Sequence, residues 1–258
     1  MPRLGPPRNQ LARAARHAAL RLGPLAPAQG ARGRGACLAD DASDRRRPRR
    51  FHDAAGAENP FHRDRRDLHP IMSTDPAFFD RLYAENIDPW GYETSAYEAE
   101  KYALTLGLLA DRRFSRAVEI GCSIGVLSAR IARRCDHFLG VDAAEAALAR
   151  ARERGLGNAE FRRAVLPGDW PPGAWDLIVF SEVLYFFDAD DIARLAGLAA
   201  GALSAGGVIL VVSYLGETET ELGGLDSEQA FIRSLLRHRP TRITGEVARP
   251  GFRALSLE

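Results

Sequence analysis

The sequence has few of the features that would assign a protein to a class at first sight. Its 258 residues contain three cysteines, Cys37, Cys122 and Cys135, which are odd in number and irregularly spaced. That pattern fits neither a disulfide framework nor a paired zinc motif. No apolar run approaches the roughly 20 residues of a membrane span, and the six histidines do not pair at metal-ligand spacing. We therefore expect no metal, no membrane association and a reducing, cytoplasmic setting.

Lysine is almost missing, because Lys101 stands alone against 34 arginines, a bias typical of a GC-rich genome. Residues 1–71 carry 15 arginines and 7 acids, a net charge of +8, whereas residues 72–258 carry 20 basic and 27 acidic residues, a net charge of −7. The first segment is rich in Pro, Ala and Gly and has too few apolar residues to offset the entropy of ordering. We expect a disordered extension over 1–71 and one domain over 72–258.

Three interpretations of the extension remain open. In the first interpretation, translation starts at Met72, and residues 1–71 result from an over-extended gene start. The second is a basic arm for nucleic acid or an acidic membrane surface. The third is an export signal at Arg49-Arg50-Phe51, which we favour least because no apolar stretch follows it.

Residues 117–125 carry the strongest functional signal in the chain. An apolar strand ends in a turn that contains Gly121 and Gly125, and an apolar-periodic helix follows over 126–134. A second strand then ends at Asp142, 21 positions after Gly121. A strand, a glycine turn, a helix and an acid about twenty residues on are typical of the nucleotide-binding half of a doubly wound α/β domain.

The glycine pattern favours one nucleoside cofactor over another. Read from Gly121, the Gly-x-Gly-x-x-Gly fingerprint of dinucleotide enzymes finds other residues in its second and third glycine positions. The acid-x-Gly-x-Gly-x-Gly pattern of S-adenosylmethionine enzymes fits Glu119, Gly121 and Gly125 and departs only at Ser123. We expect Asp142 to accept hydrogen bonds from both ribose hydroxyls. The structural alternative is an ordinary strand-to-helix turn with a solvated acid.

Strands and helices alternate in the rest of the chain. A capping box, Ser95 with Glu98, opens one predicted helix, and Asp75-Pro76 opens another. Further helices are expected over 144–155, 192–203 and 231–236, further strands over 160–165, 175–180 and 208–213, and a terminal hairpin over 241–247 and 252–257. The order predicts an α/β fold with a doubly wound, mostly parallel seven-stranded sheet and a C-terminal antiparallel hairpin, the layout of class I methyltransferases.

Four segments resemble the NodS-type (nodulation protein S) methyltransferases, namely residues 88–102, 119–125, 170–171 and 176–185. The resemblance covers about residues 75–257, and Ser123 then matches the family pattern instead of departing from it. It implies N-methylation dependent on S-adenosylmethionine, which in the namesake acts on the amino sugar of a chitin-type oligosaccharide. Residues 215–226 are acidic and lack histidine, which departs from the family and leaves the acceptor open.

The remaining cofactor contacts are predicted from position at the strand ends. Together with the turn and ribose residues, the predicted set comprises Trp90, Tyr97, Glu119, Gly121, Cys122, Ser123, Gly125, Asp142, Ala143, Ala164, Val165, Leu166 and Ser181. Residues 164–166 end the third strand of the pattern, where backbone groups are expected to meet the adenine. Trp90 and Tyr97 are candidates for a cation–π contact to the sulfonium, with helix packing as the alternative. Lys101 is expected at a solvated position.

Glu182 and Tyr185 follow the fourth strand, at the edge where ligands bind in such sheets. Both are candidate catalytic residues that would take a proton from an amine or hold a cation. The alternatives are a turn carboxylate for Glu182 and a core aromatic for Tyr185.

These observations predict an S-adenosylmethionine-dependent methyltransferase that N-methylates an amine of a small molecule or an amino sugar. Two alternatives remain, a non-catalytic S-adenosylmethionine-binding protein and, less favoured, an NAD-dependent oxidoreductase. The expected partner is a small-molecule or saccharide amine. A nucleic acid is not expected, because no Asn/Asp-Pro-Pro-aromatic segment follows the fourth strand. The oligomeric state is not fixed by the sequence.

Overall fold

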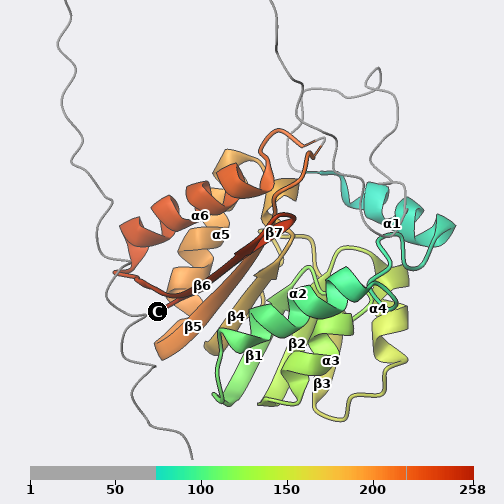
Figure 1. Ribbon diagram of the computed structural model, residues 1–258, viewed down its shortest axis with the longest axis horizontal. Helices are drawn as coiled ribbons and strands as arrows, with labels where there is room; N and C mark the ends of the chain where they lie inside the picture. The colour runs from blue at the N-terminus through green and yellow to red at the C-terminus, as the bar shows by residue number, and fades with distance from the viewer. Residues whose placement is uncertain (1–73, 219) are drawn as a thin grey trace, which may run out of the picture. The chain divides into compact units, whose positions relative to one another are not determined.

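The computed structural model describes residues 74–218 and 220–258 (Figure 1). The interpretations of the extension over 1–71 lie outside these described residues and stay predictions. The described elements, in chain order, are α1 (Pro76–Glu85), α2 (Ala96–Gly107), β1 (Phe114–Ile120), α3 (Val126–Ala132), β2 (Cys135–Asp142), α4 (Glu145–Arg152), β3 (Ala159–Arg163), β4 (Trp175–Ser181), the 3₁₀ turn η3 (Leu184–Phe186), α5 (Ala189–Ala202), β5 (Leu203–Tyr214), α6 (Gly224–His238), β6 (Ile243–Arg249) and β7 (Phe252–Leu257).

The strands form one seven-stranded sheet in the order β3-β2-β1-β4-β5-β7-β6. β1 pairs in parallel with both β2 and β4, so the strand order reverses between β1 and β4. β7 lies antiparallel between β5 and β6. This is the doubly wound, mostly parallel sheet with a C-terminal hairpin that the sequence predicts, and the fold class is confirmed. Ligands bind such sheets at the carboxyl ends of the strands beside the reversal.

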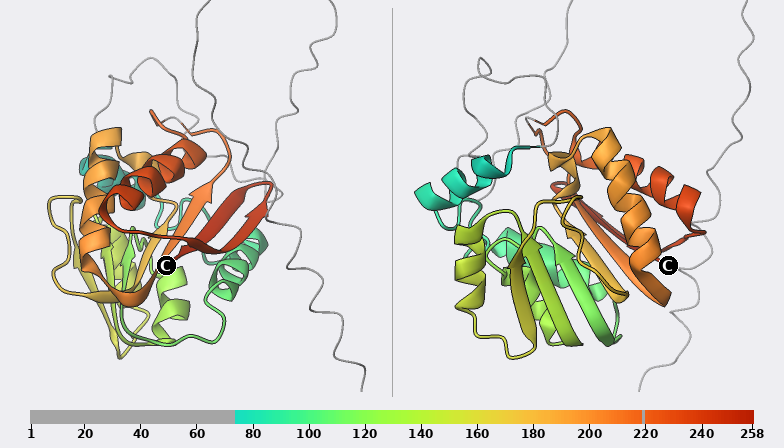
Figure 2. Two further views of the ribbon diagram at one scale, coloured as in Figure 1. Left: turned by 90° about the vertical axis from the view of Figure 1, so that its left-hand side faces the viewer. Right: turned by 180° about the vertical axis from the view of Figure 1, so that it is seen from behind.

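Helices cover both faces of the sheet, and the central strands are buried on both sides. Leu177 and Val179 of β4 pack into a cluster with residues of α2, α3 and α4. Ile178 and Phe180 point the other way, into a cluster with α5 and α6. Figure 1 shows α2 and α3 in front of the strands, and the rear view in Figure 2 shows α5 in front of them. This two-sided burial explains why β4 reads as a continuous apolar run.

The first two helices begin where their capping residues predict. Asp75 caps α1 by accepting a hydrogen bond from the amide two residues on, at 2.9 Å, and Ser95 Oγ accepts from the Glu98 amide at 3.3 Å. The second half of the predicted capping box is wrong. The Glu98 carboxylate does not return to the Ser95 amide but binds Lys101 at 2.8 Å, so an ion pair replaces the reciprocal cap.

The boundary between α3 and β2 differs from the predicted one. The helix expected over 126–134 ends at Ala132, and β2 begins at Cys135, which pairs with Phe114 of β1. Strand pairing therefore overrides the local helical pattern. Cys122 and Cys135 are both buried free thiols. None of the helices in the described part of the chain combines the length and apolar character that a membrane span requires.

Candidate functional site

A cavity of about 250 Å³ opens at the carboxyl ends of β1, β2 and β4, beside the reversal of strand order. Its walls come from these strand ends, from the segment after β3, and from α1 and the loop that follows α1. Ten of the predicted site residues line it: Trp90, Gly121, Ser123, Asp142, Ala143, Ala164, Val165, Leu166, Ser181 and Glu182. A second cavity of about 30 Å³ shares Gly121, Ser123, Ser181 and Glu182 and adds two more predicted residues, Glu119 and Cys122.

Three residues of the turn after β1 have a left-handed backbone conformation. Gly121 and Gly125 have φ angles of 74° and 75°, and Ser123 has 49°. A Cβ on Gly121 would lie 2.7 Å from the Val183 side chain, so glycine is needed there for space as well as for conformation. Gly125 does not line the cavity; it caps α3 and lets α4 approach, because its own Cβ would lie 2.9 Å from that of Ala151.

Asp142, the last residue of β2, connects the turn to the second strand. One carboxylate oxygen accepts the Ser123 amide at 2.8 Å and the other accepts the Ala144 amide at 2.9 Å. Burial raises the pKa of Asp142, while these amides and that of Ala143 oppose the rise. Each carboxylate oxygen can accept a second hydrogen bond, so Asp142 retains acceptor capacity on the cavity side.

Tyr83 of α1 closes over the turn. Its hydroxyl lies 2.5 Å from Ser123 Oγ, and burial raises its pKa well above the ordinary value. The serine at this position thus has a partner of its own, which a glycine would lack.

The side chains of Glu119, in β1, and Cys122, in the turn, are both buried. Glu119 is 1% exposed and accepts a hydrogen bond from Ser128 Oγ at 2.5 Å. Burial raises the pKa of Glu119 to about 8, against its ordinary 4.5, so this side chain is mostly protonated at neutral pH. Burial also raises the pKa of the Cys122 thiol, which keeps it neutral.

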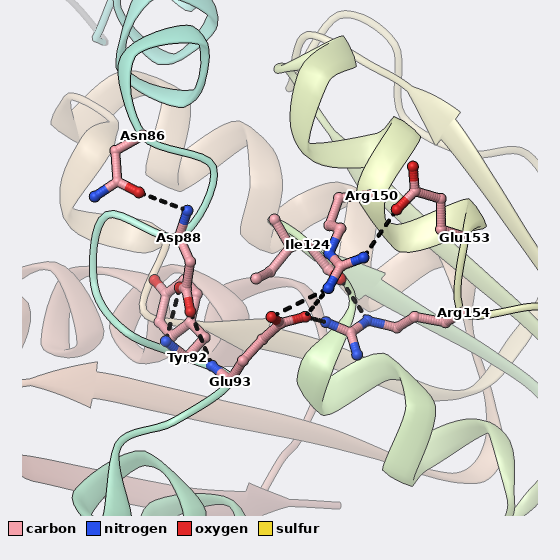
Figure 3. A network of polar contacts seen from close by, with 8 residues as sticks. All are labelled: Asn86, Asp88, Tyr92, Glu93, Ile124, Arg150, Glu153 and Arg154. Atoms are coloured by element: carbon pink, nitrogen blue, oxygen red, sulfur yellow. Dashed lines mark hydrogen bonds and ion pairs between the residues drawn. The ribbon is translucent and has the colours of Figure 1, made fainter.

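A polar network fixes the loop between α1 and α2 that carries Trp90 to the cavity (Figure 3). Asp88 accepts the amides of Tyr92 and Glu93 at 2.7 and 3.0 Å. Glu93 in turn pairs with Arg150 at 3.0 Å and Arg154 at 2.8 Å.

Arg154 also donates to the Ile124 carbonyl at 2.6 Å, which ties the same network to the glycine turn (Figure 3). The aromatic rings of Tyr83, Trp90 and Tyr92 pack in sequence, with centroid separations of 5.7 and 5.5 Å. The network and the rings together set the aromatic side of the cavity.

Lys101 does not lie at the solvated position expected from the sequence. Its side chain is 1% exposed, and its Nζ binds Glu98 Oε1 at 2.8 Å and Glu182 Oε2. The expectation is wrong because the fold places two carboxyl groups beside Lys101. Glu98 lies one helical turn before it, and Glu182 follows the end of β4.

Tyr97 and Tyr185 are not among the residues that line either cavity. The Tyr97 ring packs edge-on against Phe252, with centroids 6.1 Å apart, and the Lys101 Nζ lies 5.5 Å from its centroid. Tyr185 lies in η3 and packs against Phe186 at 4.6 Å. Burial raises the pKa of Tyr185 well above its ordinary value, so its hydroxyl keeps its proton and is poorly suited to act as a base.

Several lining residues were not predicted as site residues, among them Phe79, Tyr83, Tyr92, Val183, Phe187 and Asp191. Some of these had a signal in the sequence. Phe79 and Tyr83 lie on one apolar face of the helix that Asp75-Pro76 opens, and Tyr92 directly follows the turn-forming residues Asp88-Pro-Trp-Gly91. An apolar face that has no other partner is a reason to look for contact with a site.

Sequence comparisons match the central part of the chain. The family model described as nodulation protein S (NodS) matches residues 80–204. Nodulation protein S of Sinorhizobium fredii is 30% identical over 111 residues, which cover 42% of this chain and 50% of that protein. The chain spans about half the length of the curated relatives it matches.

Two solved structures are similar over most of their own length. A candidate methyltransferase of Pseudomonas syringae is 33% identical, with a TM-score of 0.53 and coverage of 63% of this chain and 98% of that one. The N-methyltransferase NodS of Bradyrhizobium japonicum, solved with S-adenosyl-L-homocysteine, is 18% identical, with a TM-score of 0.58 and coverage of 69% and 96%. At that identity the second match concerns the fold alone.

The strand order, the edge cavity and the Pseudomonas syringae relative define the class: the chain belongs to the class I methyltransferases. Within that class, the predicted resemblance to the nodulation protein S family is confirmed by the family match and by three curated relatives.

Proposed function

We propose that this protein is an S-adenosylmethionine-dependent methyltransferase that N-methylates an amine of a small molecule or an amino sugar. The charge of the larger cavity carries the proposal. Three carboxylates, Asp142, Glu182 and Asp191, are among its lining residues, and the described lining contains no Arg, Lys or His. A dinucleotide would bring two phosphate charges to this acidic lining. S-adenosylmethionine instead brings a sulfonium and an ammonium group against one carboxylate, a net positive charge that suits it.

The residues that line the cavity suit three parts of this cofactor, namely its ribose, its adenine and its sulfonium. Asp142 would bind the ribose hydroxyls through the acceptor capacity left beside its two backbone amides. Val165 and Leu166 would form the walls of the adenine site. Trp90 and Tyr83 lie on the aromatic side of the cavity and would face the cation.

The bound cofactor supplies an electrophilic methyl group, and the protein's part is to orient the acceptor and manage its proton. An in-line displacement gains most from alignment of the two reacting atoms, which a rigid cavity at a strand edge favours. Glu182 is the residue we assign to the acceptor nitrogen, because it lines both cavities. Tyr185 is assigned a packing role, since its raised pKa keeps its proton in place.

An amine acceptor is proposed from the match to the nodulation protein S family, because the NodS of Bradyrhizobium japonicum is an N-methyltransferase. A carboxylate at the acceptor side is also the group that best binds an ammonium ion or receives its proton. The acidic residues of the lining favour such a substrate over an anionic one.

Transfer of labelled methyl groups tests the proposal. The full-length protein would be incubated with radiolabelled S-adenosylmethionine and a panel of amines, beginning with glucosamine and de-N-acetylated chitin oligosaccharides. The N-acetylated forms of the same sugars are the matched controls, because they differ only at the nitrogen. Label is expected on free amines alone. Tight binding of S-adenosylhomocysteine with no transfer to any amine would contradict methyltransferase activity and favour a non-catalytic binding protein.

A further inference from the structure

The chain's single lysine is buried beside the larger cavity. Lys101 is 1% exposed, and its Nζ bridges Glu98 of α2 and Glu182 after β4. We call these three residues the Glu98–Lys101–Glu182 cluster. Burying a lysine is costly unless its charge is matched. Here the two carboxylates more than offset the effect of burial and raise the pKa of Lys101, so it stays charged.

The cluster has more acceptor capacity than donors. The two carboxyl groups provide four oxygens, and the Lys101 ammonium binds two of them. The buried oxygen Glu182 Oε1 has no hydrogen-bond partner among the described residues, whereas Glu98 also interacts with the Tyr102 hydroxyl. An unsatisfied buried acceptor is unfavourable, so Glu182 Oε1 is suited to a donor that arrives with a ligand.

A ligand in either cavity can reach Glu182 but not Glu98. Glu182 lines both cavities, whereas Glu98 lines neither. Glu182 also adopts a left-handed backbone conformation, with φ of 53°, which is unfavourable for a residue other than glycine. Its amide donates to the Val212 carbonyl at 2.8 Å and fixes this turn. A backbone under strain that presents a carboxylate to a cavity is typical of a functional position.

We propose that Lys101 is a positioning residue that fixes the orientation of the Glu182 carboxylate, so that Glu182 Oε1 binds the ammonium group of a primary or secondary amine acceptor beside the methyl donor. The inference rests on the proposed function and adds Lys101, the residue that positions the group that binds the amine. The Lys101 ammonium binds Glu182 Oε2, which leaves Glu182 Oε1 for the ligand.

The donor's own ammonium group has the same chemistry as an amine acceptor and is the alternative partner of Glu182. Sinefungin separates the two. It is an analogue of the donor in which a carbon bearing an ammonium group replaces the methylated sulfonium, so its extra charge lies where the acceptor nitrogen would meet the methyl group. S-adenosylhomocysteine has the same amino-acid ammonium but no charge at that position.

The experiment compares the affinities of these two ligands for the full-length protein by calorimetry. Wild type is expected to bind sinefungin roughly 10- to 100-fold more tightly than S-adenosylhomocysteine, the range of one charge-assisted hydrogen bond. Glu182→Gln and Lys101→Met are expected to lose most of this preference while still binding S-adenosylhomocysteine like wild type. Glu100→Gln, an exposed acid on the same helix, is the matched control and should keep it.

Each other result overturns a stated part of the inference. Equal loss of both ligands in Glu182→Gln would assign Glu182 to the donor's ammonium group. No preference in wild type, or a preference that survives Glu182→Gln, would remove the amine site. A full preference in Lys101→Met would remove the positioning role, and Lys101→Leu, which also lacks a donor, repeats that test if Lys101→Met does not fold. Failure of folded wild type to bind S-adenosylhomocysteine would instead reject the proposed function.

Discussion

Asp142 offers the sharpest single-residue test of the cofactor site. Its two carboxylate oxygens already accept amides at 2.8 and 2.9 Å, one from Ser123 and one from Ala144. Two further hydrogen bonds to ribose hydroxyls would both be charge-assisted, at about 1.5–3 kcal/mol each. Their joint loss in Asp142→Ala therefore corresponds to about 3–6 kcal/mol, or roughly a 10²- to 10⁴-fold weaker affinity for S-adenosylhomocysteine. Asp142→Asn keeps one oxygen and should fall between this variant and wild type.

Calorimetric titration with S-adenosylhomocysteine measures these affinities. Asp136→Asn is the matched control, because Asp136 is an exposed acid at the other end of the same strand, and it should bind like wild type. Thermal unfolding of the unliganded variants checks that the turn persists after its amides lose their partner. A folded Asp142→Ala that binds the ligand as tightly as wild type would refute the ribose assignment.

Two further predictions concern the strand before the turn and the packing of the turn. Because the folded pKa of Glu119 is raised from 4.5 to about 8, its protonated form stabilises the fold at low pH, and that stability is lost as the pH rises from 4.5 toward 8. Glu119→Gln should therefore be as stable as wild type near pH 4.5. Above pH 8 the variant should unfold at a higher temperature than wild type, because its free energy of unfolding is larger by at most about 5 kcal/mol. Equal pH profiles of the two proteins would count against the raised pKa. Gly125→Ala and Gly155→Ala both place alanine at a positive φ, but only the first meets another residue, with its Cβ 2.9 Å from that of Ala151. Denaturant unfolding should show a loss of about 1 kcal/mol for Gly155→Ala and about 1–3 kcal/mol more for Gly125→Ala, and equal losses would contradict the packing argument.

The fold was largely predictable because its signals are local. The strand before Gly121, the helix after it and the strand ending at Asp142 each have an apolar period that matches the observed element. The terminal hairpin is marked by its turn residues in the same way. The end of α3 was misplaced because no glycine or proline separates α3 from β2. The pairing of β2 with β1 therefore sets this boundary.

Many of the residues that line the cavity were also predictable, because they follow strand ends whose meeting point is fixed by the topology. The contact between Lys101 and Glu182 was not. Lys101 and Glu182 are 81 positions apart, and no local pattern links a helix lysine to a turn carboxylate. The packing of Tyr97 against Phe252 of β7 was not predictable either. Contacts of this kind depend on how distant elements pack, which a period or a motif does not encode.

The most direct test of the central claim is a pair of titrations on the full-length protein. S-adenosylhomocysteine and NAD would each be added to the same folded sample in a calorimeter. The acidic lining of the cavity predicts micromolar binding of S-adenosylhomocysteine and no heat from NAD. Binding of NAD in preference, or no heat from either ligand, would contradict the assignment of this cavity to S-adenosylmethionine.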